Sequence, residues 1–319
     1  MSKTNFGSTA LTAGAILFAA QMAIGASGIF ARFALQGTGP VMVSALRLTI
    51  ASLILIVVYL RSERQAVSRR HEILFAICGL ALSAHFATWM ASLCYITVAT
   101  STFIICTAPL WTTLYDIVVL KNKPTMKFWL GFVFAAIGTY LIVAGSASSV
   151  SGGDLSVSSL KHSDIPYFGE LLAAVGGLAF AFYLIAIRSV THNYKTLTII
   201  TRTYSWSSVF LWVFALGVGD KVPGLNFESW SGILAMALVV QMFGHTCLNA
   251  SLKTFEPRVV ALTTLLEPII AGVLASFIFG EAITLQMIAG GVLLIGALAL
   301  VMAISPVEAE IEQVALAVN

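Results

Sequence analysis

Long apolar runs separated by short polar segments dominate the chain. Runs of spanning length lie near residues 11–33, 40–60, 73–94, 99–120, 127–145, 165–187, 197–218, 229–250, 259–279 and 283–304. A helix needs about 20 apolar residues to cross a bilayer, and a spanning segment must bond its own backbone polar groups. The pattern therefore predicts an all-α polytopic membrane protein with ten transmembrane helices.

The second half of the sequence repeats the first. The matched pairs are, at an offset of 159, Pro109 with Pro268 and Gly131 with Gly290, and, at an offset of 155, Arg47 with Arg202. A unit of five spans begins and ends on opposite faces of the membrane, so the second copy is expected to be inverted. Inverted repeats are typical of secondary transporters, whose sites lie near mid-membrane between the halves.

Four regions follow from this repeat. We expect a first five-helix repeat at residues 1–145, a second, inverted repeat at 165–304, and a flexible linker between them at 146–164, which is rich in Ser and Gly. Residues 305–319 carry three glutamates and are expected to form a disordered acidic tail.

Composition supports a membrane protein, because 59% of the residues are hydrophobic and 10% are charged, whereas a soluble domain carries about 25% charged residues. The four cysteines lie inside apolar runs without the spacing of metal ligands or disulfides. No basic run is interleaved with aromatic residues, so nucleic acid is not an expected partner. No glycine-rich phosphate loop is present, so we expect no cofactor and no ATP-driven pumping.

The positions of Lys and Arg predict the orientation. If the N-terminus is cytoplasmic, twelve basic residues fall in cytoplasmic segments and three in external ones. Cytoplasmic segments carry the excess of Lys and Arg, so both termini are expected in the cytoplasm.

Helical spacing gathers polar and aromatic side chains into stripes. The predicted substrate-binding residues are His85, Trp89, Trp111, Tyr115, Phe180, Tyr183, Gln241, His245, Asn249 and Glu267. Such stripes suit a zwitterion with an apolar or aromatic side chain, because rings would pack its body while polar groups hold its charged end. Pro109 and Pro268 are expected to bend two spans and act as gates.

Each of these residues has a structural alternative. His85 and His245 are also suited to hydrogen bonds with neighbouring helices, and Glu267 to a bond with a backbone group that Pro268 frees. Arg47 and Arg202 are interpreted as structural anchors. A carboxylate in hydrocarbon costs about 2.5–3.5 kcal/mol on insertion scales, which favours a functional role for Glu267.

Enzymatic readings fail on geometry. Tyr115-Asp116 and the Gly217–Asp220 segment resemble intramembrane aspartyl protease motifs, but the expected topology puts the two aspartates at opposite faces. A catalytic dyad needs both carboxylates at one water. We therefore expect a protein that is not an enzyme.

The C-terminal spans carry a more specific pattern. The motif E-P-x-x-A, G-E, Q-x-x-x-G-G and L-I-x-G stands here as Glu267, Pro268, Ala271, Gly280, Glu281, Gln286, Gly290, Gly291, Leu294, Ile295 and Gly296. It resembles the second repeat of the drug/metabolite transporter superfamily, EamA type, and Thr107–Leu110 is similar to the first repeat. His85, Trp89 and Ala108–Trp111 look most like the YddG-like bacterial amino-acid exporters. The first repeat departs from the second, since Ala108 stands where Glu267 does.

This resemblance implies a secondary transporter that exports aromatic or hydrophobic amino acids, or similar small metabolites, across the bacterial inner membrane by alternating access. It implies a small-molecule substrate, a lipid bilayer, and a monomer or weak homodimer. The alternative is a proton-coupled exporter of cationic drugs or other metabolites.

Overall fold

The computed structural model describes residues 3–96, 98–149, 165–222, 224, 226–280 and 282–318, with side chains for 12–96, 100–145, 165–222, 224, 226–278, 280 and 282–301. Every regular element in these ranges is a helix. The first half contains α1 (Lys3–Gly25), α2 (Ser27–Ala34), α3 (Pro40–Arg61), α4 (Arg69–Ser92), α5 (Val98–Ile105), α6 (Ala108–Val118) and α7 (Met126–Ser149).

The second half begins with two long helices, continues with two interrupted segments and ends with a long helix. It contains α8 (Phe168–Arg188), α9 (Thr196–Val218), α10 (Phe227–Ala235), the π-helix η1 (Met236–His245), α11 (Thr246–Ser251), α12 (Pro257–Thr263), the 3₁₀ turn η2 (Thr264–Leu266), α13 (Glu267–Phe279) and α14 (Leu285–Val318). Of the expected linker, residues 150–164 lie outside the described residues. The expected disordered tail is helical as far as Val318, in a sequence with three Ala and three Glu, which are strong helix formers.

Among the described residues, seven segments are long and apolar enough to cross a membrane. They are Thr12–Ala34, Pro40–Arg61, Arg69–Ser92, Met126–Gly145, Phe168–Arg188, Phe227–Ser251 and Pro257–Ile278. The other three expected spans are also helical. The span at 99–120 contains α5 and α6, the span at 197–218 corresponds to α9, and the span at 283–304 corresponds to the first part of α14. The chain is thus a multi-pass helical membrane protein.

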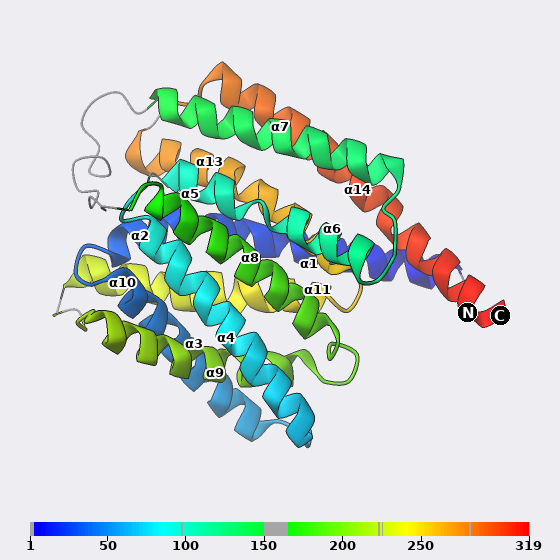
Figure 1. Ribbon diagram of the computed structural model, residues 1–319, viewed down its shortest axis with the longest axis horizontal. Coiled ribbons are helices and arrows are strands. Elements are labelled where there is room, and N and C mark those ends of the chain that lie inside the picture. Colours follow the sequence, from blue (N-terminus) through cyan, green and yellow to red (C-terminus); the bar gives the residue numbers. More distant parts are fainter. Residues whose placement is uncertain are drawn as a thin grey trace.

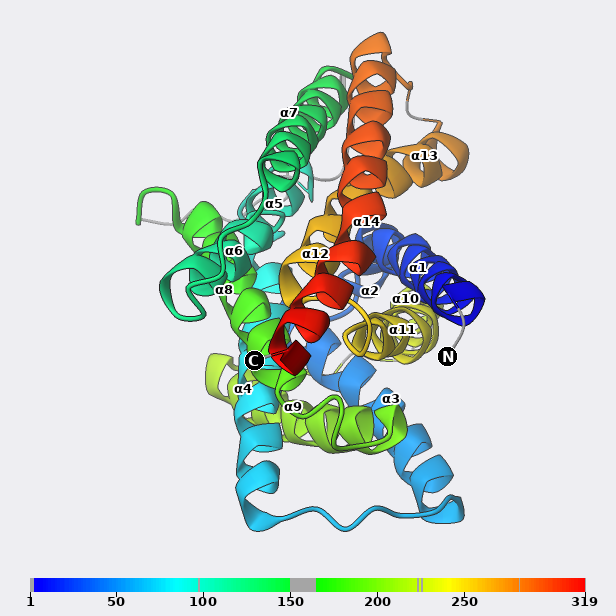
Figure 2. The same cartoon turned by 90° about the vertical axis from the view of Figure 1, so that its right-hand side faces the viewer.

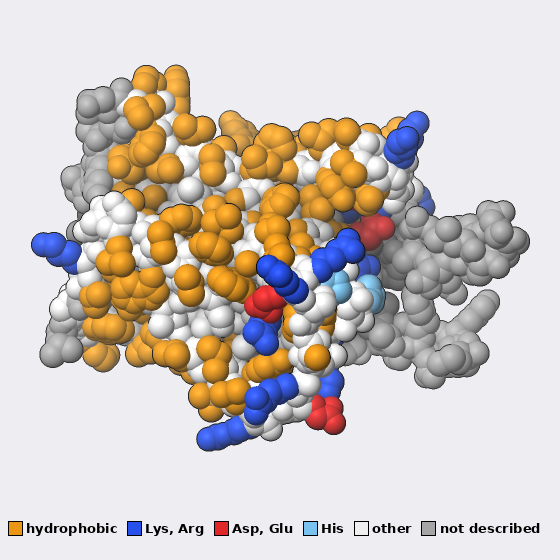
Figure 3. Space-filling model, turned by 60° about the horizontal axis from the view of Figure 1, so that its bottom comes forward, with side chains coloured by type: hydrophobic (Ala, Val, Ile, Leu, Met, Phe, Trp, Pro, Cys, Tyr) orange, Lys and Arg blue, Asp and Glu red, His pale blue; other side chains and the backbone are white. Residues whose placement is uncertain are grey.

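The helices form one elongated bundle, in which α1 begins and α14 ends at the same end (Figure 1). α4 packs along α8 and α9, α3 packs along α9, and α1 packs against η1. α7 and α14 run side by side along one flank (Figures 1 and 2). Hydrophobic side chains cover broad areas of the surface in Figure 3, as they should where lipid surrounds the protein.

Prolines and glycines define many helix ends. Proline stands in the first turn of α3, α6, α12 and α13, where its missing N–H breaks no helical hydrogen bond. Gly219 and Gly280 end α9 and α13 with φ of 77° and 71°, which favours glycine because a Cβ is strained there. Asp220 caps the start of α3, because its Oδ2 accepts from the N–H groups of Val41 (2.9 Å) and Met42 (3.1 Å).

Four expected spans are interrupted in mid-course. α1 gives way to α2 at Ala26, and α5 to α6 at Cys106 and Thr107. The π-helix η1 separates α10 from α11, and η2 separates α12 from α13. Each interruption alters the regular i→i−4 hydrogen bonding of the α-helix. At membrane depth such irregular backbone occurs only where it is buried inside a protein or lines a cavity.

The contact between α7 and α14 depends on glycine. A Cβ on Gly290 would lie 2.5 Å from the carbonyl oxygen of Gly138, whereas a Cβ on Gly296 of the same helix would meet nothing within 4 Å. We predict that Gly290→Val lowers the free energy of unfolding by about 1–3 kcal/mol, the usual cost of overpacking. Gly296→Val is the matched control and should leave the melting temperature in detergent unchanged. Equal effects of the two substitutions would contradict this packing.

Candidate functional site

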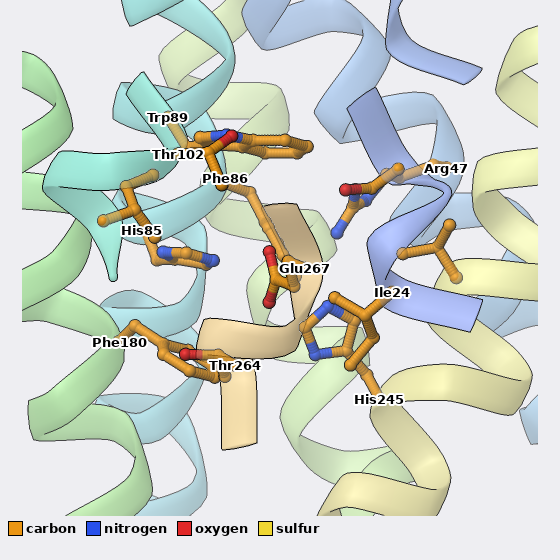
Figure 4. A pocket seen from close by; sticks show the side chains of 13 residues that line it. Ile24, Arg47, His85, Phe86, Trp89, Thr102, Phe180, His245, Thr264 and Glu267 are labelled. Atoms are coloured by element: carbon orange, nitrogen blue, oxygen red, sulfur yellow. The ribbon is translucent and has the colours of Figure 1, made fainter. Parts of the chain in front are cut away.

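A small closed cavity lies in the middle of the bundle, where the interrupted helices meet (Figure 4). It is lined by Ile24, Ser27, Arg47, His85, Phe86, Trp89, Thr102, Ile105, Phe180, Val240, His245, Thr264 and Glu267. These residues come from α1 to α5, α8, η1, η2 and α13, so both halves of the chain contribute.

The interruptions place residues around this cavity. Ile24 and Ser27 flank the α1–α2 break, and His245 ends the π-helix η1. Thr264 begins η2 and Glu267 directly follows it. The irregular backbone of four spans therefore gathers at one internal site, as in transporters whose binding sites use broken helices.

The cavity is nearly filled by its own side chains. Its volume is about 30 Å³, enough for little more than a single water molecule, whereas small-molecule sites measure about 300–1,000 Å³. The described conformation is thus a closed form of the site, and any organic ligand requires the surrounding helices to move apart.

Aromatic rings form one wall. The ring of His85 stacks against that of Phe180 with centroids 4.7 Å apart, and lies parallel to Trp89 at 6.5 Å. Phe86 meets His245 edge to face at 5.2 Å. His85 Nδ1 lies 2.9 Å from the carbonyl oxygen of Gly176. Because a carbonyl can only accept, Nδ1 carries the proton, and a neutral ring keeps Nε2 as an acceptor.

A basic and an acidic side chain face the same cavity. Arg47 is 0% exposed; its Nη2 donates to Gln241 Oε1 at 2.9 Å and its Cζ lies 3.7 Å from the centroid of Phe86. Its Nε and Nη1 have no hydrogen-bond partner among the described residues. Glu267, from α13, likewise has no hydrogen bond or ion pair within the described part of the chain. Both charges therefore retain unused bonding capacity at one place.

A second polar group lies behind the aromatic wall. Tyr183 donates to Asn249 Oδ1 at 2.5 Å, and Asn249 Nδ2 donates to the carbonyl oxygen of His245 at 2.7 Å. All three residues are buried. The network joins α8 to α11 and fixes the backbone of His245 at the end of η1.

The structure sorts the predicted binding residues into three groups. His85, Trp89, Phe180, His245 and Glu267 line the cavity. Gln241, Tyr183 and Asn249 lie just behind it, where Gln241 holds Arg47 and the other two bond each other. Trp111 and Tyr115 are outside the lining.

The placement of Trp111 and Tyr115 corrects the expected stripe on residues 99–120. That stripe assumes a continuous helix, but α5 ends at Ile105 and α6 begins at Ala108. The buried face of α6 is formed by Ala108, Pro109, Thr112, Thr113 and Asp116. Trp111, 38% exposed, points away from that face.

The two prolines proposed as gates occupy equivalent places. Pro109 stands in the first turn of α6, directly after the break from α5. Pro268 stands in the first turn of α13, directly after η2. Each lies beside a helix interruption, and their gating role remains a prediction.

Sequence reasoning missed Arg47, Phe86, Thr102 and Thr264 as cavity residues. A signal for Arg47 was present, since it is a charge inside an apolar run, as Glu267 is. The cost of burying a charge in hydrocarbon applies to both alike.

The described residues contain no group of three His, Cys, Asp or Glu placed to hold a metal ion.

Interrupted membrane helices around an internal cavity are typical of secondary transporters of small molecules. The sequence model of the EamA-like transporter family matches the chain over residues 12–144 and again over 167–303. The chain belongs to the EamA-like transporter family.

Several relatives carry transporter names. The chain is 24% identical over 277 residues to the uncharacterized transporter YyaM of Bacillus subtilis (strain 168), covering 85% of this chain and 87% of the relative. It is 19% identical over 268 residues to an uncharacterized transporter of Archaeoglobus fulgidus, covering 83% of this chain and 90% of the relative. These names support membrane transport as the function.

A solved crystal structure shares the fold. It aligns with a TM-score of 0.74 over 92% of this chain and 97% of its own, at 14% sequence identity. At this identity the likeness supports the fold alone.

The network behind the cavity should contribute to stability. In Tyr183→Phe the oxygen of Asn249 loses its donor, and an unsatisfied buried acceptor costs about 1–3 kcal/mol. We predict a lower melting temperature in detergent for this variant. Tyr140→Phe, at a tyrosine that is 58% exposed, is the matched control and should melt as the wild type does. An unchanged melting temperature for Tyr183→Phe would show that the bond does not stabilise the bundle.

Proposed function

We propose that this protein is a secondary transporter that exports amino acids with aromatic or hydrophobic side chains across the bacterial inner membrane. The observation that carries the proposal is the pair of unmatched charges, Arg47 and Glu267, at one closed cavity. A free amino acid carries a carboxylate and an ammonium group on the same carbon. It therefore presents the two charges that this site leaves unpaired.

Each charge has a specific task in this account. Arg47 keeps Nε and Nη1 free, and a guanidinium binds a carboxylate through two such nitrogens in a planar fork. Glu267 accepts the ammonium group. The rings of His85, Trp89 and Phe180 pack the side chain of the substrate, which accounts for a preference for aromatic or apolar amino acids.

The same charges argue against the alternative substrate. A lipophilic cation would be attracted by Glu267 but repelled by Arg47, whose single polar partner in the described structure is the neutral amide of Gln241. The cationic-drug exporter therefore fits this cavity less well than an exporter of zwitterions.

The architecture supports alternating access. We propose that all ten expected segments cross the membrane as two inverted five-helix repeats. The family match falls once in each half. In this arrangement α3 corresponds to α9 and α7 to α14, and the two helices of each pair pack together. α4 corresponds to the segment that contains η1, and α1 corresponds to α8, so the contact of α4 with α8 matches that of η1 with α1. Under the predicted orientation both termini lie in the cytoplasm.

Opening would move the helix pieces on either side of the interruptions. We propose that Pro109 and Pro268 mark the two hinges, because no N–H bond has to break there. At the contact of α6 with α12, Arg258 lies 3.4 Å from Asp116 and 2.5 Å from Glu256. Arg258 and Asp116 are buried and join the two helices, so this pair would have to separate or slide when the halves rock.

Counterflow in proteoliposomes tests the substrate. We expect liposomes preloaded with phenylalanine to take up labelled phenylalanine, with no comparable exchange of tetraphenylphosphonium. Exchange of the cation alone would favour the cationic-drug exporter and overturn the proposal. A parallel set with a collapsed pH gradient shows whether exchange needs protons.

Substrate analogues separate the two charges. In Arg47→Gln we expect phenylalanine exchange to fall at least about tenfold, the effect of losing one charge-assisted bond. Phenylalaninamide, which has no carboxylate, should be less affected by Arg47→Gln than phenylalanine. Glu267→Gln should instead impair both compounds, because each keeps the ammonium group.

The matched control for these variants is Arg70→Gln, which removes a charge from an exposed residue outside the cavity, tested for equal expression and melting temperature. The assigned roles would be contradicted if Arg47→Gln and Glu267→Gln fold normally but neither variant changes the exchange of phenylalanine relative to that of phenylalaninamide.

A pair of tryptophans tests the placement of the site. Trp89 lines the cavity and Trp111 does not, so Trp89→Ala should reduce exchange at least about tenfold, as expected for removing a large aromatic contact. Trp111→Ala should stay within about twofold of the wild type, since surface changes are usually within ±0.5 kcal/mol. The reverse order of effects would place the substrate along α6 instead.

A further inference from the structure

A second hollow lies on the periphery of the bundle, where α3 and α4 diverge beneath α9. It measures about 720 Å³ and is bounded by Ile56, Tyr59 and Leu60 of α3, residues 64–67 of the connection, Glu72 of α4, and Thr201, Arg202, Ser205, Trp206 and Val209 of α9. Figure 2 shows the connection from α3 to α4 along the bottom of the molecule, with α9 above it. We refer to this hollow as the α3–α9 groove.

The groove is separate from the central cavity. Tyr204 and Ser207 occupy the buried face of α9, and Tyr204 meets Asn249 in the core. Arg202, Trp206 and Val209 occupy the other side and line the groove. None of its lining residues lines the cavity, so substrate binding does not account for it.

Hydrogen bonds hold the walls of the groove in place. Gln65 Oε1 accepts from the backbone N–H of Lys195 at 2.6 Å and from the Thr198 hydroxyl at 3.1 Å. Tyr59 donates to the carbonyl oxygen of Gln65 at 3.2 Å. Lys195 also pairs with Glu63 at 2.7 Å, and its hydrogen bond and charge lower the pKa of that exposed carboxyl group. The connection is thus tied to the start of α9, and the hollow is preformed.

The charges that face the groove sum to a positive value. Arg64 and Arg202 are both in the lining, and Glu72 is its only carboxylate among the described residues. Glu72 accepts from Trp206 Nε1 at 2.8 Å and lies 3.7 Å from Arg202 Nη1. Arg202 Nε has no partner in the described part of the chain. Arg61, Arg69 and Arg70 flank the same stretch of sequence and lie outside the lining of the groove.

Apolar surface continues from this charged end toward the hydrocarbon. Ile56, Leu60 and Val209 line the groove itself. Beyond Glu72 and Trp206 a further cleft of about 260 Å³ follows α4 and α9, lined by Ile73, Ala76, Ile77, Leu80 and Phe210. In Figure 3, Lys and Arg side chains gather near the lower edge beside broad hydrophobic surface. A soluble anion would use the charges but leave these apolar walls exposed.

We propose that the α3–α9 groove binds one anionic phospholipid, with its phosphate between Arg64 and Arg202 and its acyl chains along the apolar walls. Basic pockets between helices on the cytoplasmic side of a membrane protein are suited to anionic lipid headgroups. The positive-inside distribution of Lys and Arg puts this groove at the cytoplasmic leaflet. The lipid occupies the space between two helices of the first half and α9 of the second.

Native mass spectrometry of the purified full-length protein tests the site. The protein is titrated with phosphatidylglycerol, with phosphatidylcholine of the same acyl chains, and with inorganic phosphate. We expect one tightly retained phosphatidylglycerol, weaker retention of phosphatidylcholine, and no effect of phosphate up to millimolar concentration. Equal retention of the two lipids, or displacement of the lipid by phosphate, would overturn the proposal.

Matched arginine variants locate the lipid. Arg64→Gln combined with Arg202→Gln should lower phosphatidylglycerol retention by roughly tenfold or more, since each basic residue near a membrane surface contributes appreciably to the binding of an anionic lipid. Arg61→Gln combined with Arg70→Gln removes the same charge from residues outside the lining and should stay within about twofold of the wild type. Equal losses in both double variants would mean general attraction to the surface and contradict a specific site.

A second measurement covers the case in which the double variant is unstable. Arg64→Gln alone changes a residue of the connection and keeps Arg202 with Glu72. Phosphatidylglycerol with brominated acyl chains should quench the fluorescence of Trp206. This contribution is identified as the part of the signal that is lost in Trp206→Phe. Arg64→Gln should weaken the quenching. Quenching that is the same in Arg64→Gln as in the wild type would also contradict the proposal.

Discussion

The structure depends on the high free-energy cost of unpaired polar groups inside a membrane. Regular helices avoid this cost by bonding their own backbone, and ionised side chains in hydrocarbon are costly. This chain departs from both rules around the central cavity. Four interrupted spans converge there, Glu267 lines the cavity, and Arg47 faces it with two unpaired nitrogens. In the proposed function the substrate supplies the missing partners.

The rest of the bundle packs closely around that site. Helices from both halves surround a volume of about 30 Å³, while continuous helices such as α7 and α14 pack closely through Gly138 and Gly290 along one flank. Both interrupted and uninterrupted helices line the cavity, whereas α7 and α14 contribute no lining residue. The proposed alternating access suits this arrangement, because the site must open on either side while the protein stays folded.

Much of this could be predicted from the sequence. The apolar runs predicted helices whose bounds differ from the structure by a few residues, except at the start of α1 and the end of α14. Five of the ten proposed binding residues line the cavity. Trp111 and Tyr115 lie outside the cavity lining, on α6 after the break at Cys106 and Thr107, which helical spacing along a continuous span does not anticipate. Arg47 was missed because a charge several turns from a helix end is equally consistent with anchoring. Its unpaired nitrogens are visible only once α3 is packed against Gln241.

The central claim is that Arg47 and Glu267 hold opposite ends of one amino acid, and internuclear distances measure this directly. Solid-state NMR on liposomes containing the protein with bound phenylalanine, ¹³C-labelled at its carboxyl carbon, and ¹⁵N-labelled arginine reports the carboxyl-to-guanidinium distance. The account predicts a dipolar coupling that corresponds to about 4 Å, the separation of a hydrogen-bonded pair, and its disappearance in Arg47→Lys. A bound substrate whose carboxyl carbon shows no coupling to any arginine, or an undiminished coupling in Arg47→Lys, would contradict it.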